Sequence, residues 1–376
     1  MKRATVIVLD SFGVGQMPDS ASFDDKNPDT AGHIYEACGE LLLPNMYAMG
    51  LSHIDGVNLP KYTGKVCGKY AKLAEKSHGK DTVTGHWELM GIVSEHGFSI
   101  YEHGFPEYFM SKLESAWGVG TLCNEPASGT EVINRLGKEH VNTGKPIVYT
   151  SADSVLQVAA HEDVIPLSDL YDMCEKAREL LDMHNMNVAR VIARPFTGDE
   201  TQGFMRTENR RDYSVVPPQD SVLDILSERG VRTLGIGKIE DIFAHRGLSL
   251  ADHTKNNEDG INAVIAHLKA CDSDFIFANL VDFDMLYGHR RDALGYKKAL
   301  EYFDSTLPDI ISLMTDGDML IITADHGCDP TAPGTDHTRE YVPMLMRCGR
   351  DCERAENLGI IEGFDFVGKS VLEWLS

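Results

Sequence analysis

Carboxylate and imidazole side chains follow or flank strand-like apolar stretches at both ends of this chain. The motifs are V-D-F-D-M-L-Y-G-H, I-I-T-A-D-H-G and G-T-D-H-T-R-E-Y near the C-terminus, and A-T-V-I-V-L-D near the N-terminus. Their candidate metal ligands are Asp10, Asp284, His289, Asp325, His326 and His337. Such ligands suit Mn²⁺, Zn²⁺ or Mg²⁺, and the pattern alone does not choose among them. Two cations about 3.5–4 Å apart clamp the oxygens of a transferring phosphoryl group, so the motifs predict phosphoryl-transfer chemistry.

Strand-like and helical patterns alternate at both ends of the chain. We expect strands at Thr5–Leu9, Thr233–Ile236, Phe275–Val281 and Met319–Thr323. Helical spacing marks Asn262–Ala270 and Lys297–Leu313, and Ser221 is expected to cap a helix that Gly230 ends. This alternation predicts an α/β fold with a mostly parallel sheet flanked by helices. Such sheets bind ligands at the carboxyl ends of their strands, where the candidate ligands fall.

The sequence pattern changes in the middle of the chain. It contains a loop-like P-A-S-G-T, a strand P-I-V-Y-T, a helix near Ser168–Met183 and a strand N-V-A-R-V-I-A. The pair Pro217-Pro218 suits a linker. We therefore expect an inserted α+β domain at residues 93–216. Residues 1–92 and 217–376 would form the metal-binding catalytic core domain.

Composition narrows the classes of partner. The 376 residues carry a formal net charge of -23, which argues against binding to nucleic acid or to an anionic membrane. Apolar runs are too short to cross a bilayer, and M-K-R-A-T-V-I-V-L-D lacks a cleavage site for a signal peptide. The eight cysteines are scattered without a C-x-x-C pair, as in reduced proteins. We expect a cytoplasmic protein.

A further motif, K-S-H-G-K-D-T-V-T-G-H-W-E, opens a helix-like stretch. Hydroxyl groups and backbone amides at a helix N-terminus favour an anion. The local sequence by itself fits an ordinary capping threonine better than a nucleophile, since a threonine hydroxyl needs a metal or a base to activate it.

Six motifs together resemble one family in order along nearly the whole chain. They are D-S-F-G-V-G, G-K-D-T-V-T-G-H-W-E, Y-T-S-A-D-S-V-L-Q, V-I-A-R-P-F, N-L-V-D-F-D-x-x-x-G-H-R-R-D and A-D-H-G-x-D-P-x-x-P-G-T-D-H-T-R-E-Y-V-P. They resemble the bacterial phosphopentomutases of the alkaline phosphatase superfamily. The resemblance implies an alkaline-phosphatase-like core, an inserted cap domain that closes over the substrate, and a place in nucleoside catabolism.

The resemblance also implies a role for each candidate residue. One cation would be held by Asp284, His289 and His337, and the other by Asp10, Asp325 and His326. Thr82 would be the phosphorylated residue, with Thr84 as the competing candidate. Arg194, Arg206, Arg210 and Lys238 would bind a sugar phosphate, and Ser151 and Asp153 would contact ribose hydroxyls. For these basic residues the alternative is surface charge, and for Ser151 and Asp153 it is turn capping.

The implied activity interconverts (deoxy)ribose 1-phosphate and (deoxy)ribose 5-phosphate through a phosphothreonine and a 1,5-bisphosphate. Mn²⁺ would be the metal, and a bisphosphate primer such as glucose 1,6-bisphosphate would load the enzyme. The rival interpretations are a metal-dependent phosphoglycerate mutase or phosphatase of the same superfamily, and a non-catalytic sugar-phosphate or metal sensor. The sequence predicts no oligomeric state.

Overall fold

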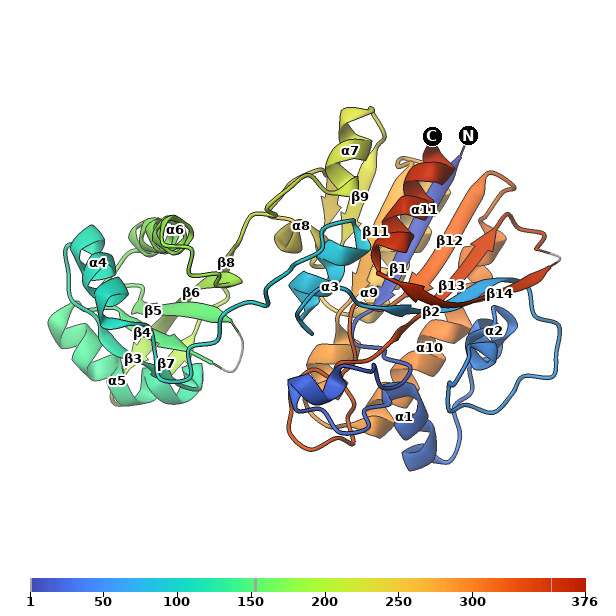
Figure 1. The fold of residues 1–376 in the computed structure, drawn as a ribbon. Coiled ribbons are helices and arrows are strands. Elements are labelled where there is room, and N and C mark those ends of the chain that lie inside the picture. Colours follow the sequence, from blue (N-terminus) through green and yellow to red (C-terminus); the bar gives the residue numbers. More distant parts are fainter. Residues whose placement is uncertain (1, 152–153, 353) are drawn as a thin grey trace. The chain divides into compact units, whose positions relative to one another are not determined.

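The computed structural model describes residues 2–151, 154–352 and 354–376, and the chain forms two compact units (Figure 1). The first unit comprises Met1–Gly97 and Pro217–Ser376, and the second comprises Phe98–Val216. The second unit thus interrupts the first in sequence. It begins at residue 98. The sequence predicted that the insertion would begin at residue 93.

The first unit is built on an eight-stranded sheet with the strand order β10-β9-β11-β1-β12-β13-β2-β14. Its strands are β1 (Arg3–Leu9), β2 (Gly68–Ala74), β9 (Thr233–Ile236), β10 (Leu250–Asp252), β11 (Phe275–Leu280), β12 (Asp318–Thr323), β13 (Val342–Cys348) and β14 (Ala355–Glu362). Strand β13 runs antiparallel to β12 and β2, and the other described pairs are parallel. Every residue of β1 is buried, as expected for a central strand covered on both faces. The predicted mostly parallel sheet is confirmed.

Helices cover this sheet in two packing groups (Figure 1). One group contains α1 (Thr30–Cys38), α2 (Pro44–Ala48), α9 (Asn257–Ala270) and α10 (Ala293–Ser312), and the other contains α3 (Thr82–Leu89), α7 (Val222–Glu228), α8 (Ile239–Ile242) and α11 (Asp365–Leu375). Short helical turns are η1 (Ser20–Phe23), η2 (Leu51–His53) and η3 (Phe283–Gly288). None of the described helices is both long and apolar enough to span a bilayer.

Some helix starts were predicted correctly from local sequence signals, and others were not. Ser221 caps α7 through a reciprocal capping box with Asp224, as the sequence predicted for this N-cap. Helices α9 and α10 begin before the predicted Asn262 and Lys297. Their first turns begin after the N-caps Asn256 and Asp292, whose side chains accept from the helix amides, and the apolar spacing starts only later.

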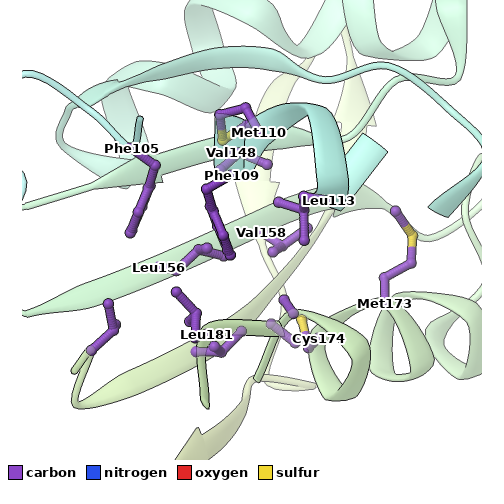
Figure 2. Close-up of a cluster of buried hydrophobic side chains, with 14 of the residues drawn as sticks. Phe105, Phe109, Met110, Leu113, Val148, Leu156, Val158, Met173, Cys174 and Leu181 are labelled. Carbon is purple, nitrogen blue, oxygen red and sulfur yellow. The ribbon is translucent and has the colours of Figure 1, made fainter. Parts of the chain in front are cut away.

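The second unit has its own sheet, in the order β3-β4-β5-β6-β7 with β8 also paired to β6. Its elements are α4 (Glu107–Trp117), β3 (Leu122–Pro126), α5 (Gly129–Thr143), β4 (Ile147–Thr150), β5 (Val155–His161), α6 (Leu167–Met183), β6 (Arg190–Asp199), β7 (Gly203–Arg206) and β8 (Arg211–Ser214). Helices α4 and α6 bury one face of this sheet over a core that includes Phe109, Leu156 and Leu181 (Figure 2). Helix α5 covers part of the other face. The P-A-S-G-T stretch expected as a loop is one only at its middle, because Pro126 ends β3 and Gly129 begins α5.

Candidate metal centre and nucleophile

Parallel register brings the predicted ligands to one edge of the first unit's sheet. Leu9 of β1 lies opposite Leu280 of β11, and Val8 lies opposite Thr323 of β12. The residues that follow these strands therefore meet where the strands end. Asp10 comes directly after β1, and Asp325 follows β12 closely.

Asp284 and His289 reach the same edge through an uncommon element. Residues Phe283–Gly288 form a π-helix that begins shortly after β11, with His289 as its C-cap. Wide π-helical turns often occur at functional sites. The sequence predicted both ligands but gave no indication of this turn.

The first ligand group is fully buried. Ligand atoms of Asp10, Asp325 and His326 lie within 4.8 Å of one another. Nε2 of His326 is 3.5 Å from Oδ1 of Asp10 and 3.3 Å from Oδ2 of Asp325. The other ring nitrogen, Nδ1, lies 3.0 Å from the carbonyl oxygen of Gly327. Donation to that carbonyl leaves Nε2 as the free ligand atom.

The second group centres on Asp284. Its two carboxylate oxygens lie 3.3 Å from Nε2 of His337 and 3.2 Å from Nε2 of His289. Two ligand sets include it: Asp284 with His326 and His337, and Asp284 with His289 and Cys328. The structure therefore places the histidines around Asp284 and brings His326 beside His337. It also adds Cys328, which neither of the predicted ligand sets contains.

Unsatisfied buried atoms test whether cations fit here. Asp10 Oδ1, Asp284 Oδ1, Asp325 Oδ2 and His337 Nε2 are buried and make no hydrogen bond of good geometry among the described residues, although imidazole nitrogens lie 3.1–3.5 Å from the three carboxylate oxygens. Buried polar atoms are normally satisfied, so four such atoms at one place need positive partners. Divalent cations meet that need, and the donor set of oxygen and nitrogen suits them.

The electrostatics of the site agree with this conclusion. Burial and the charges of Asp325 and Asp284 raise the pKa of Asp10 to about 7. Burial lowers the pKa of His326, but the carboxylates of Asp325, Asp10 and Asp284 outweigh it and hold the pKa well above its ordinary value. Without cations the cluster thus retains protons that bound metal would displace.

The two threonines of the K-D-T-V-T motif have different environments. Thr82 is the first residue of α3, and its Oγ1 lies 3.2 Å from Nε2 of His326. The hydroxyl of Thr84 instead donates to Oδ2 of Asp81 at 2.6 Å, inside the N-cap of the same helix. The hydroxyl of Thr82 therefore faces the ligand cluster, while that of Thr84 is used in helix capping.

Close packing holds α3 against the metal ligands. A side chain at Gly85 would overlap the backbone carbonyl of Asp325, so only glycine permits this approach. His86 is fully buried beneath the site, and its Nδ1 lies 2.8 Å from the carbonyl of Thr82 and 3.1 Å from Oδ2 of Asp325. Asn279, which no sequence motif singled out, contacts both Asp10 and His86.

Arg339 connects the loops around the site. Its buried guanidinium donates to the carbonyls of Ser77 and Gly79 at 2.9 and 2.6 Å and forms an ion pair with Glu75. Its backbone amide donates to Asp25. Arg339 thereby ties the segment of His337 to the loop that precedes Thr82.

The predicted substrate contacts are distributed over both units. Lys238 is half-buried at the carboxyl end of β9 in the first unit. Arg194 on β6, Arg206 on β7 and Arg210 belong to the second unit, as does the half-buried Ser151 after β4. Asp153 lies outside the described residues.

Comparisons with known proteins show the family of this chain. A model of the Metalloenzyme superfamily matches residues 2–376. The phosphopentomutase of Clostridium kluyveri is 49% identical over 375 residues, covering 100% of this chain and 96% of the relative. The phosphopentomutase of Caldanaerobacter subterraneus subsp. tengcongensis is 51% identical over 373 residues, covering 99% and 94%.

The chain belongs to the phosphopentomutase family. It is accordingly an isomerase of a metalloenzyme superfamily that uses divalent metals, the groups described above are candidate ligands, and its α/β fold is alkaline-phosphatase-like. The solved structure of the PH0037 protein from Pyrococcus horikoshii has the same fold, with a TM-score of 0.51 at 14% identity over 100% of this chain and 97% of that one.

Proposed function

We propose that this phosphopentomutase interconverts ribose or deoxyribose 1-phosphate and 5-phosphate through a phosphothreonine at Thr82. The observation that carries the proposal is the position of the Thr82 hydroxyl, 3.2 Å from His326 Nε2 at the first residue of α3. The positive end of the helix dipole favours a phosphoryl group at this hydroxyl.

The reaction transfers a phosphoryl group twice. Phosphorylated Thr82 gives its phosphoryl group to the free C1 or C5 hydroxyl of the sugar monophosphate. The Oγ1–P bond breaks, a sugar O–P bond forms, and the proton of the sugar hydroxyl ends on Oγ1 of Thr82. The resulting 1,5-bisphosphate reorients and returns its other phosphate to Thr82. A bisphosphate primer such as glucose 1,6-bisphosphate would load an unphosphorylated Thr82.

Six side chains would hold the two cations, with Mn²⁺ as the expected metal. They are Asp10, Asp325 and His326 for one cation and Asp284, His289 and His337 for the other. Bound cations would lower the pKa of the threonine hydroxyl and offset the charge of the phosphoryl oxygens.

The second unit would act as a cap that excludes water. Without that exclusion, phosphothreonine would hydrolyse and the enzyme would become a phosphatase. Arg194, Arg206 and Arg210, together with Lys238, would bind the sugar phosphate, and Ser151 and Asp153 would bind ribose hydroxyls. Arg suits this task because its planar guanidinium grips two phosphate oxygens. The proposal also places the protein in the cytoplasm.

The test compares Thr82→Ala with Thr84→Val in a Mn²⁺-dependent assay of ribose 5-phosphate formation from ribose 1-phosphate. Free phosphate is recorded in the same tube, and intact-mass spectrometry follows the phosphoenzyme. Thr82→Ala should lose both turnover and the mass of one phosphate. Thr84→Val should keep the phosphate at Thr82 but be less stable, because the bond to Asp81 is lost.

Other outcomes would redirect the assignment. Normal turnover by Thr82→Ala would refute the phosphothreonine. Dominant phosphate release by the wild type would favour a phosphatase, and turnover of 3-phosphoglycerate would favour a phosphoglycerate mutase. Stoichiometric metal binding without turnover would favour a sensor.

A further inference from the structure

Ser11 has a backbone conformation that residues other than glycine rarely adopt. It follows Asp10 at the end of β1, is fully buried and has a φ of 73°. Because this left-handed region is sparsely populated, the surrounding contacts must hold Ser11 in it. Its backbone amide donates to Oδ1 of Asp325 over 3.0 Å, and its carbonyl accepts from the amide of Cys328 at 3.1 Å. The turn therefore directs one N–H group at a candidate metal ligand.

The hydroxyl of Tyr296, on helix α10, contacts this turn. It lies 3.1 Å from Oγ of Ser11 and donates to the backbone carbonyl of Asp10 over 3.4 Å. Because a carbonyl only accepts, the tyrosine proton faces Asp10, and the hydroxyl of Ser11 donates to the tyrosine oxygen. Tyr296 is completely buried, so both hydrogen bonds are shielded from solvent. The tyrosine hydroxyl therefore connects the last residue of the turn to the first.

The ring of Tyr296 also contacts the turn that carries the second ligand group. Its centroid lies 5.5 Å from that of Phe283 and 6.3 Å from that of Tyr287. Both residues belong to the π-helix that contains Asp284 and that His289 ends. These separations are typical of aromatic rings that pack against one another. One buried side chain therefore contacts the segments of both ligand groups.

We propose that Tyr296 is a positioning residue for both candidate cation sites. Its hydroxyl holds the turn of Asp10 and Ser11, so that the amide of Ser11 orients the carboxylate of Asp325. Its ring supports the π-helix that contains Asp284. This inference rests on the two-cation centre of the proposed function. Removal of the hydroxyl alone should loosen the first ligand group and leave the second in place.

Titration with Mn²⁺, followed by the electron paramagnetic resonance signal of the free ion, measures the affinity of each cation without turnover. Tyr296→Phe keeps the ring, and we expect one cation to bind about tenfold more weakly while the other keeps its affinity. Ser11→Ala should also weaken one cation. Its addition to Tyr296→Phe should have no further effect, because both substitutions remove the same hydrogen bond.

Tyr47→Phe is the matched control for these variants. The hydroxyl of Tyr47 also donates to a backbone carbonyl of the first unit, that of Leu41, over 2.9 Å. Leu41 and Tyr47 are not candidate ligands, so this variant should melt at a lower temperature and bind both cations like the wild type.

A merely structural role of Tyr296 would lower the melting temperature of the metal-free protein and leave both affinities unchanged, and that result would overturn the inference. Equal weakening by Tyr47→Phe would overturn it too, as would a further loss when Ser11→Ala is added to Tyr296→Phe. Ser11→Ala alone keeps the test valid if Tyr296→Phe does not fold. A wild type that binds fewer than two Mn²⁺ would refute the cation centre and this inference together. A wild type that binds two Mn²⁺ but gains no phosphate at Thr82 would refute the phosphothreonine alone.

Discussion

Asn279 donates a hydrogen bond from its side-chain amide to Oδ2 of Asp10 over 2.8 Å. The same nitrogen lies 3.1 Å from Nε2 of His86. Because an amide nitrogen only donates, Nε2 of His86 is the acceptor and the ring proton lies on Nδ1. That proton faces the carbonyl of Thr82 and the carboxylate of Asp325. One amide thus fixes a candidate metal ligand and the tautomer of the histidine beneath the candidate nucleophile.

We expect Asn279→Ala to weaken binding of divalent cations by about 10–100-fold, since partners that orient metal ligands commonly have effects of this size. Equilibrium dialysis with Mn²⁺ and the metal dependence of turnover would both measure it. Asn58→Ala is the control, because Asn58 is exposed and its side-chain amide donates to Glu36, which is not a candidate ligand. Unchanged metal affinity in Asn279→Ala would show that Asp10 needs no such support.

His86→Phe should lower kcat about tenfold or more while changing KM little, because the His86 ring supports the backbone of Thr82 and Asp325. His86→Asn keeps an N–H donor near the position of Nδ1 and should retain part of the lost rate. Steady-state kinetics of the two variants provide the comparison. Similar losses in both would mean that the buried volume of the ring matters and the hydrogen bonds do not.

Gly85→Ala tests the contact between α3 and the strand end that carries Asp325. The added methyl group would overlap a backbone carbonyl, which cannot rotate away, so the helix or the strand must shift. A shift of about 1 Å at a reacting group can cost about 10²-fold in rate. Turnover should fall accordingly and the melting temperature should drop. At Gly120 the nearest atom to an added methyl group is the flexible end of Lys145, at 3.4 Å, so Gly120→Ala should leave both quantities unchanged.

The pair of His33 and Asp329 should make stability depend on pH. Burial lowers the pKa of His33, but the hydrogen bond and charge of Asp329 outweigh it and raise the pKa above the ordinary 6.5. A raised histidine pKa means stabilisation that is fully present below 6.5 and is lost as pH rises through the folded-state value. His33→Asn should therefore melt below the wild type at pH about 6, with a gap that shrinks by pH about 9.

His53→Asn supplies the comparison for that measurement, because the ring of His53 faces the carbonyl of Tyr62. A gap between wild type and His33→Asn that widened with pH would contradict the sign of the effect. Thermal melts at several pH values measure how the difference in melting temperature between wild type and variant changes with pH.

The sequence predicted the candidate ligands because its signals were local. Asp10, Asp284 and Asp325 come shortly after continuous apolar runs, and strands of that kind are parallel and central. Parallel register then places their carboxyl ends together, as found for β1, β11 and β12. Those strands were predicted with at most small errors at their ends.

Other features depend on partners that lie far away in the sequence. Asn279 looked like one polar residue in the strand F-I-F-A-N-L, and only the fold brings it to Asp10 and His86. Helix α5 was missed because its polar first turn continues a loop-like stretch. Cys328 enters a ligand group because the π-helical turn directs Asp284 and His289 toward it, and no spacing in the sequence indicates that turn.

The strand order also has a consequence for synthesis on the ribosome. Strand β1 has β11 and β12 as its neighbours, and β2 has β13 and β14. Both early strands therefore pair with strands that are translated much later. The unit Phe98–Val216 is contiguous in sequence and can fold first. During translation, the second unit should therefore be folded while the N-terminal segment that precedes it still lacks the strands that complete its sheet. That segment, with the apolar β1, is where we expect chaperones to bind during translation.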